Sequence, residues 1–448
     1  MNMNKMNSQT DQPAKNMYVV NRVLDFNEPL AEGDPKYVKT EKGRGEFSFN
    51  GLLRYLGVNV EQETLFSPLE KSYNLFCGHT GCGKSTELRQ LAYNLKKKNI
   101  FFVIYLDCVN ELDHNNLNYP DIMLAIANKL LTELEENDIK IDDIFLKRLH
   151  SWFTEKILTS EKLRDFAMEV ETGLEAGVSI PLLAKLFTKL TGKIKTGATY
   201  KEVIRNEIRN SFSDFAASFN QLIQASESEL KNKGKAGKLL LIIDGTDKLR
   251  DDDSQRLFIK DVDQLMQIQA NFIYCAPIQL LYEGHQVLQR FDHFTLPMIK
   301  IFHKDSTEPY EPGINVLKKL IYKRIDANLF EDETVVDKLI KYSGGNPRLL
   351  LRLLKYAWRG SDMQQFRKKD VEKAFHLLAM DYRKFIKPED YEILYKVDKG
   401  EILDGSSDQI RRLLFDLAIL EYNSGWWRSH PAVRELDGYK KAVHASKK

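Results

Sequence analysis

A chain of 448 residues is long enough for about three domains. Its 66 basic and 64 acidic residues leave a formal net charge of +2, so contact with nucleic acid or a membrane would have to come from a local patch. The polar N-terminus has no secretory signal and no run reaches the roughly 18 apolar residues of a membrane span, so we expect a soluble cytoplasmic protein without membrane contact.

Four scattered cysteines, Cys77, Cys82, Cys108 and Cys275, form no CxxC pair. This excludes a disulfide framework and a zinc site of the usual spacing.

In chain order, residues 1–44 are polar and lack apolar periodicity, which predicts a loosely ordered arm. Apolar runs follow over residues 72–78, 100–108, 238–245, 270–277 and 293–302, with helical stretches between them. Short, fully apolar runs of this kind are typical of buried parallel strands. We therefore predict an α/β domain over residues 45–302, with helices on both faces of a parallel sheet.

A long interval between the second and third runs predicts an insertion at about residues 139–235. Its basic segment, residues 189–212, is either a contact for nucleic acid or the solvated face of a helix. Residues 303–385 read as a helical domain, and residues 386–448 as helices followed by strand, tight turn and strand.

The stretch from Gly78 to Ser85, GHTGCGKS, satisfies GxxxxGK[ST] between a strand and a helix. Backbone N–H groups and the helix N-terminus would hold phosphate oxygens, Lys84 would lie between the β- and γ-phosphates, and Ser85 would bind Mg²⁺. Cys82 is either a redox-sensitive thiol or a spectator. The predicted nucleotide-binding residues here are Gly78, His79, Thr80, Gly81, Cys82, Gly83, Lys84, Ser85 and Thr86.

A second acidic site follows in KLLLIIDGTDKL, which puts Asp244 at the end of an apolar strand. A parallel sheet projects this carboxylate toward the same crevice as the phosphate loop, where it would be a second Mg²⁺ ligand. We predict that Asp247 positions the attacking water; the alternatives are a helix cap and a surface carboxylate.

With both motifs in hand, residues 45 to 435 resemble the AAA+ and STAND group of P-loop ATPases. The resemblance implies an α/β P-loop fold with a helical lid and a C-terminal winged helix, and DGTD resembles the DGxD form of the NACHT ATPases. The segment ANFIYCAP holds the sensor 1 place, but Cys275 stands where these families usually have Asn, Thr or Ser.

The resemblance also implies further site residues. Arg290 matches an arginine finger that completes a neighbouring subunit's site, with a surface or internal salt bridge as the alternative. Pro347 and Arg348 match the part of the lid that reaches base and γ-phosphate, although GGNP is also a good helix start. His430 matches a histidine that contacts ADP phosphates; a structural histidine is the alternative.

Two classes of function follow. The first is an ATP-hydrolysing, Mg²⁺-dependent switch that couples nucleotide state to homo-oligomerisation through Arg290 and to a protein partner, in a bacterial defence or mobile-element setting. The second is a DNA-bound initiator, loader or transposition regulator that uses the basic insertion or the winged helix, where Arg411 and Arg412 lie on the expected recognition helix. A small-molecule kinase and a GTPase are less favoured, since the GGNPR segment has no role in the former and the NKxD motif of the latter does not occur.

Overall fold

The computed structural model describes residues 12–159, 178–196, 198–401 and 405–445. At its centre, five parallel strands are ordered β4-β5-β6-β3-β7. They span β3 Ser72–Gly78, β4 Phe102–Asp107, β5 Leu239–Asp244, β6 Asn271–Pro277 and β7 Asp292–Thr295. The predicted α/β fold with a parallel sheet is confirmed, although the last strand is shorter than its apolar run.

The phosphate-loop strand and the strand of the second acidic motif are separated by β6. This order brings the carboxyl ends of β3, β5 and β6 to one edge of the sheet, where ligands bind in open α/β folds. Helix α4, Lys84–Lys97, begins at that edge directly after β3.

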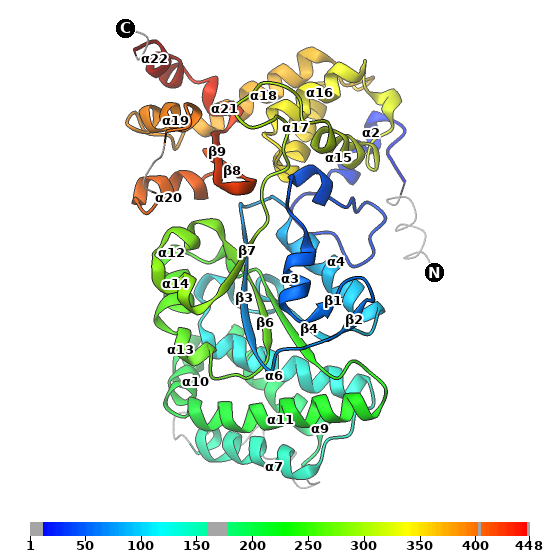
Figure 1. Cartoon of the computed structure of the whole chain (residues 1–448), viewed down its shortest axis with the longest axis vertical. Coiled ribbons are helices and arrows are strands. Elements are labelled where there is room, and N and C mark those ends of the chain that lie inside the picture. Colours follow the sequence, from blue (N-terminus) through cyan, green and yellow to red (C-terminus); the bar gives the residue numbers. More distant parts are fainter. Residues whose placement is uncertain (1–11, 160–177, 197, 402–404, 446–448) are drawn as a thin grey trace.

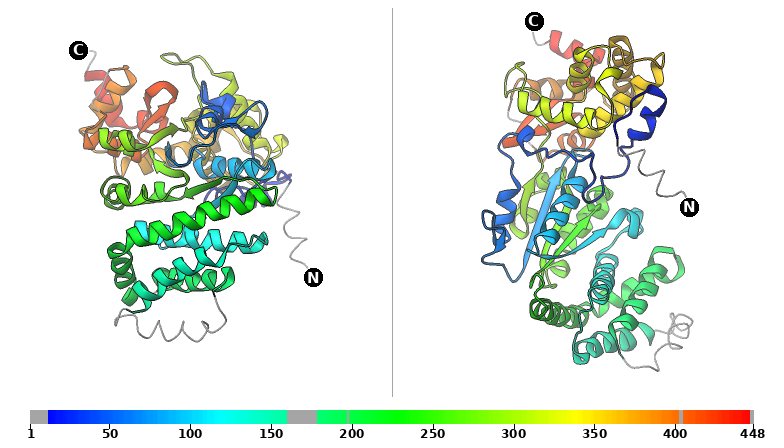
Figure 2. Two further views of the ribbon diagram at one scale, coloured as in Figure 1. Left: turned by 60° about the horizontal axis from the view of Figure 1, so that its bottom comes forward. Right: turned by 90° about the vertical axis from the view of Figure 1, so that its right-hand side faces the viewer.

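Between β4 and β5 the chain forms a helical layer on the far side of the sheet from the C-terminal helices (Figure 1). The same separation is visible in both views of Figure 2. Aromatic side chains fill its interior, including Trp152 packed on Phe215 and Phe215 on Phe219. The helices between β4 and β5 are α5 Cys108–Glu111, α6 Tyr119–Glu136, α7 Asp143–Trp152, the π-helix Phe153–Leu158, α9 Ile180–Thr196, α10 Ala198–Asn210 and α11 Phe212–Asn232.

Shorter elements precede β3 or follow β5 and β6. They are helix α3 Phe49–Tyr55, the two-residue strands β1 Val58–Asn59 and β2 Thr64–Leu65, the 3-10 turns η5 Thr246–Lys248 and η7 Ile278–Tyr282, and helices α12 Asp251–Gln255, α13 Val262–Leu265 and α14 His285–Arg290.

The helical lid consists of α15 Glu311–Tyr322, α16 Glu333–Tyr342, α17 Pro347–Gly360 and α18 Lys368–Arg383. A winged-helix arrangement follows: α19 Asp390–Asp398, α20 Asp408–Phe415, the antiparallel hairpin β8 Ile419–Tyr422 and β9 Trp426–Ser429, then α21 Pro431–Arg434 and α22 Asp437–Ala445. Lid and winged helix share one apolar core. No helix among the described residues is both long and apolar enough to cross a membrane.

Of the arm predicted over residues 1–44, residues 1–11 lie outside the described part of the chain, and residues 12–44 are packed against the rest of the protein and not loosely ordered. Its helix α2, Met17–Val23, buries Met17 and Val20 in the core of the lid. The backbone N–H of Ala14 donates to the carbonyl oxygen of Arg324, and the indole N–H of Trp358 donates to that of Met17. The few apolar residues of the arm are enough to order it, because they pack into a core that the lid largely provides.

Candidate active site

The phosphate loop connects β3 to α4 and approaches the lid closely. Gly81 and Gly83 have positive φ angles of 79° and 108°, which favour glycine. A Cβ atom at Gly81 would lie 2.7 Å from the Cβ of Arg348, so a side chain there would collide with the lid. The sequence motif and the backbone geometry therefore agree at this loop.

Lys84 and Asp247 form a buried ion pair beneath the loop. The Lys84 Nζ atom lies 2.8 Å from Oδ2 of Asp247, and the two side chains are only 3% and 7% exposed. Lys84 also donates to the carbonyl oxygens of Gly78 and His79, at 2.8 and 3.0 Å. Burial opposes the charge on each partner, but the opposite charge prevails, so the pKa of Lys84 is raised and that of Asp247 is lowered.

Asp244 lies at the end of β5 beside the first residues of α4. Its Oδ1 accepts hydrogen bonds from the Ser85 hydroxyl and the Gly245 N–H, both at 2.8 Å. Its Oδ2 accepts one from the Tyr105 hydroxyl at 2.7 Å. Burial and the nearby Asp247 raise the pKa of Asp244. A hydroxyl and a carboxylate at this separation form the oxygen-donor set that suits Mg²⁺.

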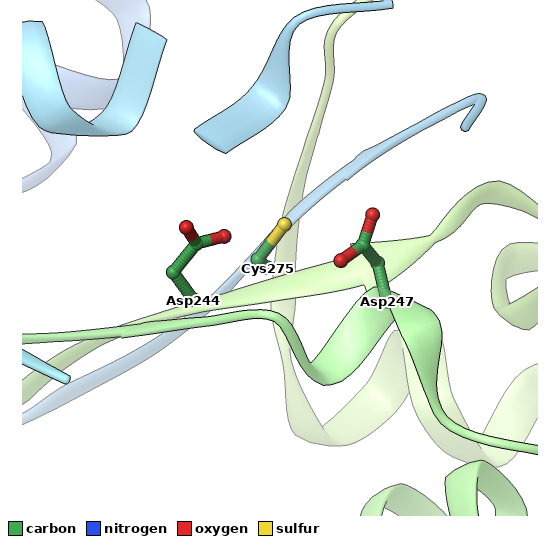
Figure 3. A group of neighbouring side chains, drawn as sticks. All are labelled: Asp244, Asp247 and Cys275. Carbon is green, nitrogen blue, oxygen red and sulfur yellow. The ribbon is translucent and has the colours of Figure 1, made fainter. Parts of the chain in front are cut away.

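Figure 3 shows Asp244, Cys275 and Asp247 pointing to the same side, with the thiol between the two carboxylates. One ligand atom from each lies within 4.8 Å of the others. Burial raises the pKa of Cys275, so the thiol is neutral. The Oδ1 atom of Asp247 has no hydrogen-bond partner among the described residues.

The lid reaches the phosphate loop through the N-terminus of α17. Asn346 caps this helix, accepting from the N–H groups of Arg348 and Leu349 at 3.0 and 3.1 Å. Its side-chain amide donates to the carbonyl oxygen of Thr80 at 3.0 Å. The N–H of Arg348 is 3.3 Å from the carbonyl oxygen of Gly81. Sequence reasoning missed Asn346, although Asn before Pro is a helix-start signal.

The arm forms another wall of the site, which sequence reasoning missed. Tyr37 donates to Glu87 on α4 at 2.8 Å, and the Thr40 hydroxyl donates to the same carboxylate. The buried guanidinium of Arg44 donates to the carbonyl oxygen of Cys82 at 2.7 Å. No periodic pattern in the sequence marks these contacts.

A cavity opens between the arm, the phosphate loop and the lid. Its lining includes the predicted residues Thr80 to Thr86, Asp247, Pro347 and Arg348. Apolar side chains of the arm and lid line it as well: Phe26, Pro29, Leu30, Val38, Leu320 and Leu351. The predicted residues Gly78, His79, Asp244, Arg290 and His430 lie outside this lining.

His79 faces the winged helix. Its Nε2 accepts a hydrogen bond from the N–H of Glu421 on β8 at 2.8 Å, so the ring proton is on Nδ1, which lies 3.1 Å from the carbonyl oxygen of Leu414. Burial and the charge of Lys84 lower the pKa of His79 to about 3. A residue of the phosphate loop is thus bonded to the backbone of the C-terminal segment.

His430 is not brought to the cavity. Its Nδ1 accepts from the N–H of Ala432 at 3.0 Å and caps α21, and its ring stacks on Tyr382 with centroids 4.7 Å apart. This geometry corresponds to the structural alternative for His430. Arg290, half exposed at 51%, pairs with Asp263 of the same chain at 2.9 Å.

The basic residues considered for DNA have partners within the chain. Arg411 pairs with Glu283 at 3.2 Å, which connects α20 to the α/β domain beside η7. Arg412 pairs with the buried Asp390 at 2.5 Å.

In the insertion, Arg205 is buried against Asp121, and Lys201 pairs with Asp113 at 2.6 Å. These two side chains of the basic segment face inward, so they do not form a nucleic-acid surface in this arrangement.

Comparison with known proteins gives similarity of structure alone. No family model and no curated protein matches the chain. Solved structures that resemble it include a Walker-type ATPase of Pyrococcus abyssi, at 11% identity and a TM-score of 0.42 over 94% of this chain and 99% of that one. Cdc6p of Pyrobaculum aerophilum matches at 10% identity and a TM-score of 0.35 over 92% and 99% of the two chains. The Orc1 protein of Aeropyrum pernix, solved in complex with DNA, matches at 12% and 0.36 over 97% of each.

The chain has an α/β fold with a phosphate loop between β3 and α4 of a parallel sheet. The sheet, the helical lid and the C-terminal segment follow one another as expected. What the site does chemically follows from its own geometry.

Proposed function

We propose that this chain binds and hydrolyses ATP with Mg²⁺, and that nucleotide binding repositions its lid and winged helix. The observation that carries the proposal is the Lys84–Asp247 ion pair, which lies at the phosphate loop beside the Ser85–Asp244 hydrogen bond. These four side chains provide the groups needed to bind phosphate, to bind a metal ion and to orient the attacking water.

Each of these residues would have a separate role in hydrolysis. A phosphate chain in the loop attracts Lys84 away from Asp247, which frees a carboxylate that can orient a water molecule and accept its proton. Ser85 and Asp244 would hold Mg²⁺, which supplies electrostatic stabilisation of the phosphate oxygens when bound. Arg348, at the start of α17, would reach the γ-phosphate from the lid.

The apolar side of the cavity suits a flat base. Leu30 and Val38 of the arm, with Leu320 and Leu351 of the lid, provide nonpolar surface from both sides. Pro347 completes this surface next to the loop. ATP is proposed as the nucleotide on this basis and on the lack of a guanine-reading NKxD motif in the sequence.

Hydrogen bonds of the phosphate loop would couple nucleotide binding to the lid, the winged helix and the arm. Thr80 is bonded to the lid through Asn346, His79 to the winged helix, and Cys82 to the arm through Arg44. Any shift of the loop on phosphate binding must strain or break these bonds, so the segments that make them respond. Assembly through Arg290 and engagement of a protein partner are further steps of the same proposal.

Turnover by Asp247→Asn protein tests the proposal. We expect wild-type protein to release ADP and free phosphate in equal amounts without an acceptor. The variant should bind Mg-ATP and lose at least about 100-fold in turnover, the usual contribution of a positioned base. Full turnover by the variant would contradict the role of Asp247, and Lys84→Ala should abolish productive nucleotide binding.

A DNA-bound ATPase is the second candidate, favoured by the winged-helix arrangement of α19, α20 and the β8–β9 hairpin. In the observed arrangement α20 lies against η7, where Arg411 pairs with Glu283. DNA binding through α20 would therefore require this contact to open first.

A further inference from the structure

Tyr105 lies beside Asp244 on the neighbouring strand of the sheet. Strands β4 and β5 pair in parallel, with Tyr105 opposite Ile242 and Asp107 opposite Asp244. The Tyr105 hydroxyl donates to Oδ2 of Asp244 at 2.7 Å. Neither sequence motif includes this tyrosine.

A bound metal ion would affect the hydrogen bonds of Asp244 to Ser85 and to Tyr105 differently. Oδ1 accepts from Ser85, and a cation held by Ser85 and Asp244 must replace that bond. Oδ2 faces Tyr105, so this bond can persist when the metal is present. Groups that orient a ligand in this way commonly affect metal affinity about 10- to 100-fold.

Burial makes the contact with Tyr105 necessary. Asp244 is only 2% exposed, so an Oδ2 without a donor would be a buried, unsatisfied carboxylate oxygen. Rotation of the carboxylate toward other hydrogen-bond donors would then lower its free energy.

We propose that Tyr105 is a positioning residue for the metal site, because its hydroxyl holds the Asp244 carboxylate with Oδ1 toward Ser85. This inference rests on the proposed function, since it assumes a divalent cation bound with nucleotide between Ser85 and Asp244. Tyr105 is not among the residues that line the cavity, so it would act on the metal site through Asp244.

The test compares Tyr105→Phe with a matched loss of another tyrosine hydroxyl. Tyr73 on β3 donates to the carbonyl oxygens of Met266 and Ile268, at the opposite end of the sheet from the phosphate loop, so Tyr73→Phe is the control. Binding of Mn²⁺ to each protein is measured by electron paramagnetic resonance with a non-hydrolysable ATP analogue. Binding of the analogue alone is measured in EDTA.

We expect Tyr105→Phe to bind Mn²⁺ at least about 10-fold more weakly than wild type, with unchanged affinity for the metal-free analogue. Tyr73→Phe should match wild type in both measurements. The Mg²⁺ concentration for half-maximal turnover should rise by the same factor, with turnover recovering at saturating Mg²⁺.

Equal Mn²⁺ affinity in Tyr105→Phe and wild type would overturn the inference. Equal losses of metal and metal-free analogue binding would also overturn it, because they would indicate a damaged site. The metal readout requires no turnover. Wild-type protein that binds Mn²⁺ with the analogue yet does not hydrolyse ATP would therefore contradict the proposed function and leave the Tyr105 comparison valid.

Discussion

The Nζ atom of Lys84 lies 2.8 Å from Oδ2 of Asp247, and both side chains are buried from water. The residue expected to hold phosphate is therefore paired with the residue expected to direct water. Each partner favours the charged form of the other. In the proposed function, phosphate would compete for the lysine, so that substrate binding would release the Asp247 carboxylate.

Removal of one partner of the Lys84–Asp247 pair should destabilise the protein, because the other charge stays buried without a counter-charge. We predict that Lys84→Ala lowers the free energy of unfolding by about 3 to 5 kcal/mol, because it leaves the Asp247 carboxylate buried without its cation. Lys84→Ala combined with Asp247→Asn should recover part of this loss. Urea denaturation without nucleotide measures both, and a double variant no more stable than the single one would show that the pair is not coupled.

His79 provides a direct report of coupling to the winged helix. We predict that a non-hydrolysable ATP analogue changes hydrogen exchange at the Glu421 amide in wild-type protein, because this N–H donates to His79. In His79→Ala the amide should exchange faster, and the analogue should bind without altering its rate. Peptide-level exchange over residues 413–422 measures this effect. A nucleotide response that persists in the variant would assign the coupling to another contact.

Acid should destabilise the protein through two buried histidines. Burial lowers the pKa of His79 and His430 to about 3, against 6.5 in the unfolded chain, so below pH 6.5 the unfolded state binds more protons. Stability is therefore lost as the pH falls, by about 2 kcal/mol per histidine between pH 7.5 and 5. Urea unfolding of His79→Gln should show a shallower pH dependence than wild type. The exposed His376→Gln is the control, and equal slopes for His79→Gln and wild type would refute this assignment.

Arg290 should matter only between subunits. We predict that Asp247→Asn protein with Mg-ATP forms an oligomer that Arg290→Ala disperses, as measured by light scattering at several protein concentrations. Asp263→Ala is the matched control, because it removes the same intrachain ion pair and leaves the arginine in place. If Asp263→Ala disperses the oligomer equally, the ion pair and not a finger in the neighbouring site explains the effect.

The Arg411–Glu283 pair predicts how DNA binding would be regulated. If α20 contacts DNA, Glu283→Gln should strengthen binding, because it weakens the contact that holds this helix on the α/β domain. Arg411→Ala with Arg412→Ala should weaken binding and reduce its salt dependence. Fluorescence anisotropy at two salt concentrations measures both. Wild-type protein without measurable affinity at low salt would remove the DNA candidate.

Local patterns in the sequence predicted the sheet and the phosphate loop well. The strand over residues 72–78 and the loop that follows it are encoded by contiguous apolar, glycine and lysine positions, which need no distant partner. Arm residues such as Arg44 and Tyr37 were missed, because their partners are on other elements and follow no periodicity. The basic character of Arg411 was visible, but charge alone does not reveal which face of a helix is covered.

The arm is bonded both to α4 through Glu87 and to the lid through Ala14 and Trp358. The arm and the phosphate loop precede the lid in the chain, so they are synthesised before the lid helices that cover the arm, which begin only at residue 311. An incomplete chain therefore presents a phosphate loop whose surrounding wall is still missing. The cavity between the arm, the phosphate loop and the lid can therefore be completed only after the lid helices have been synthesised.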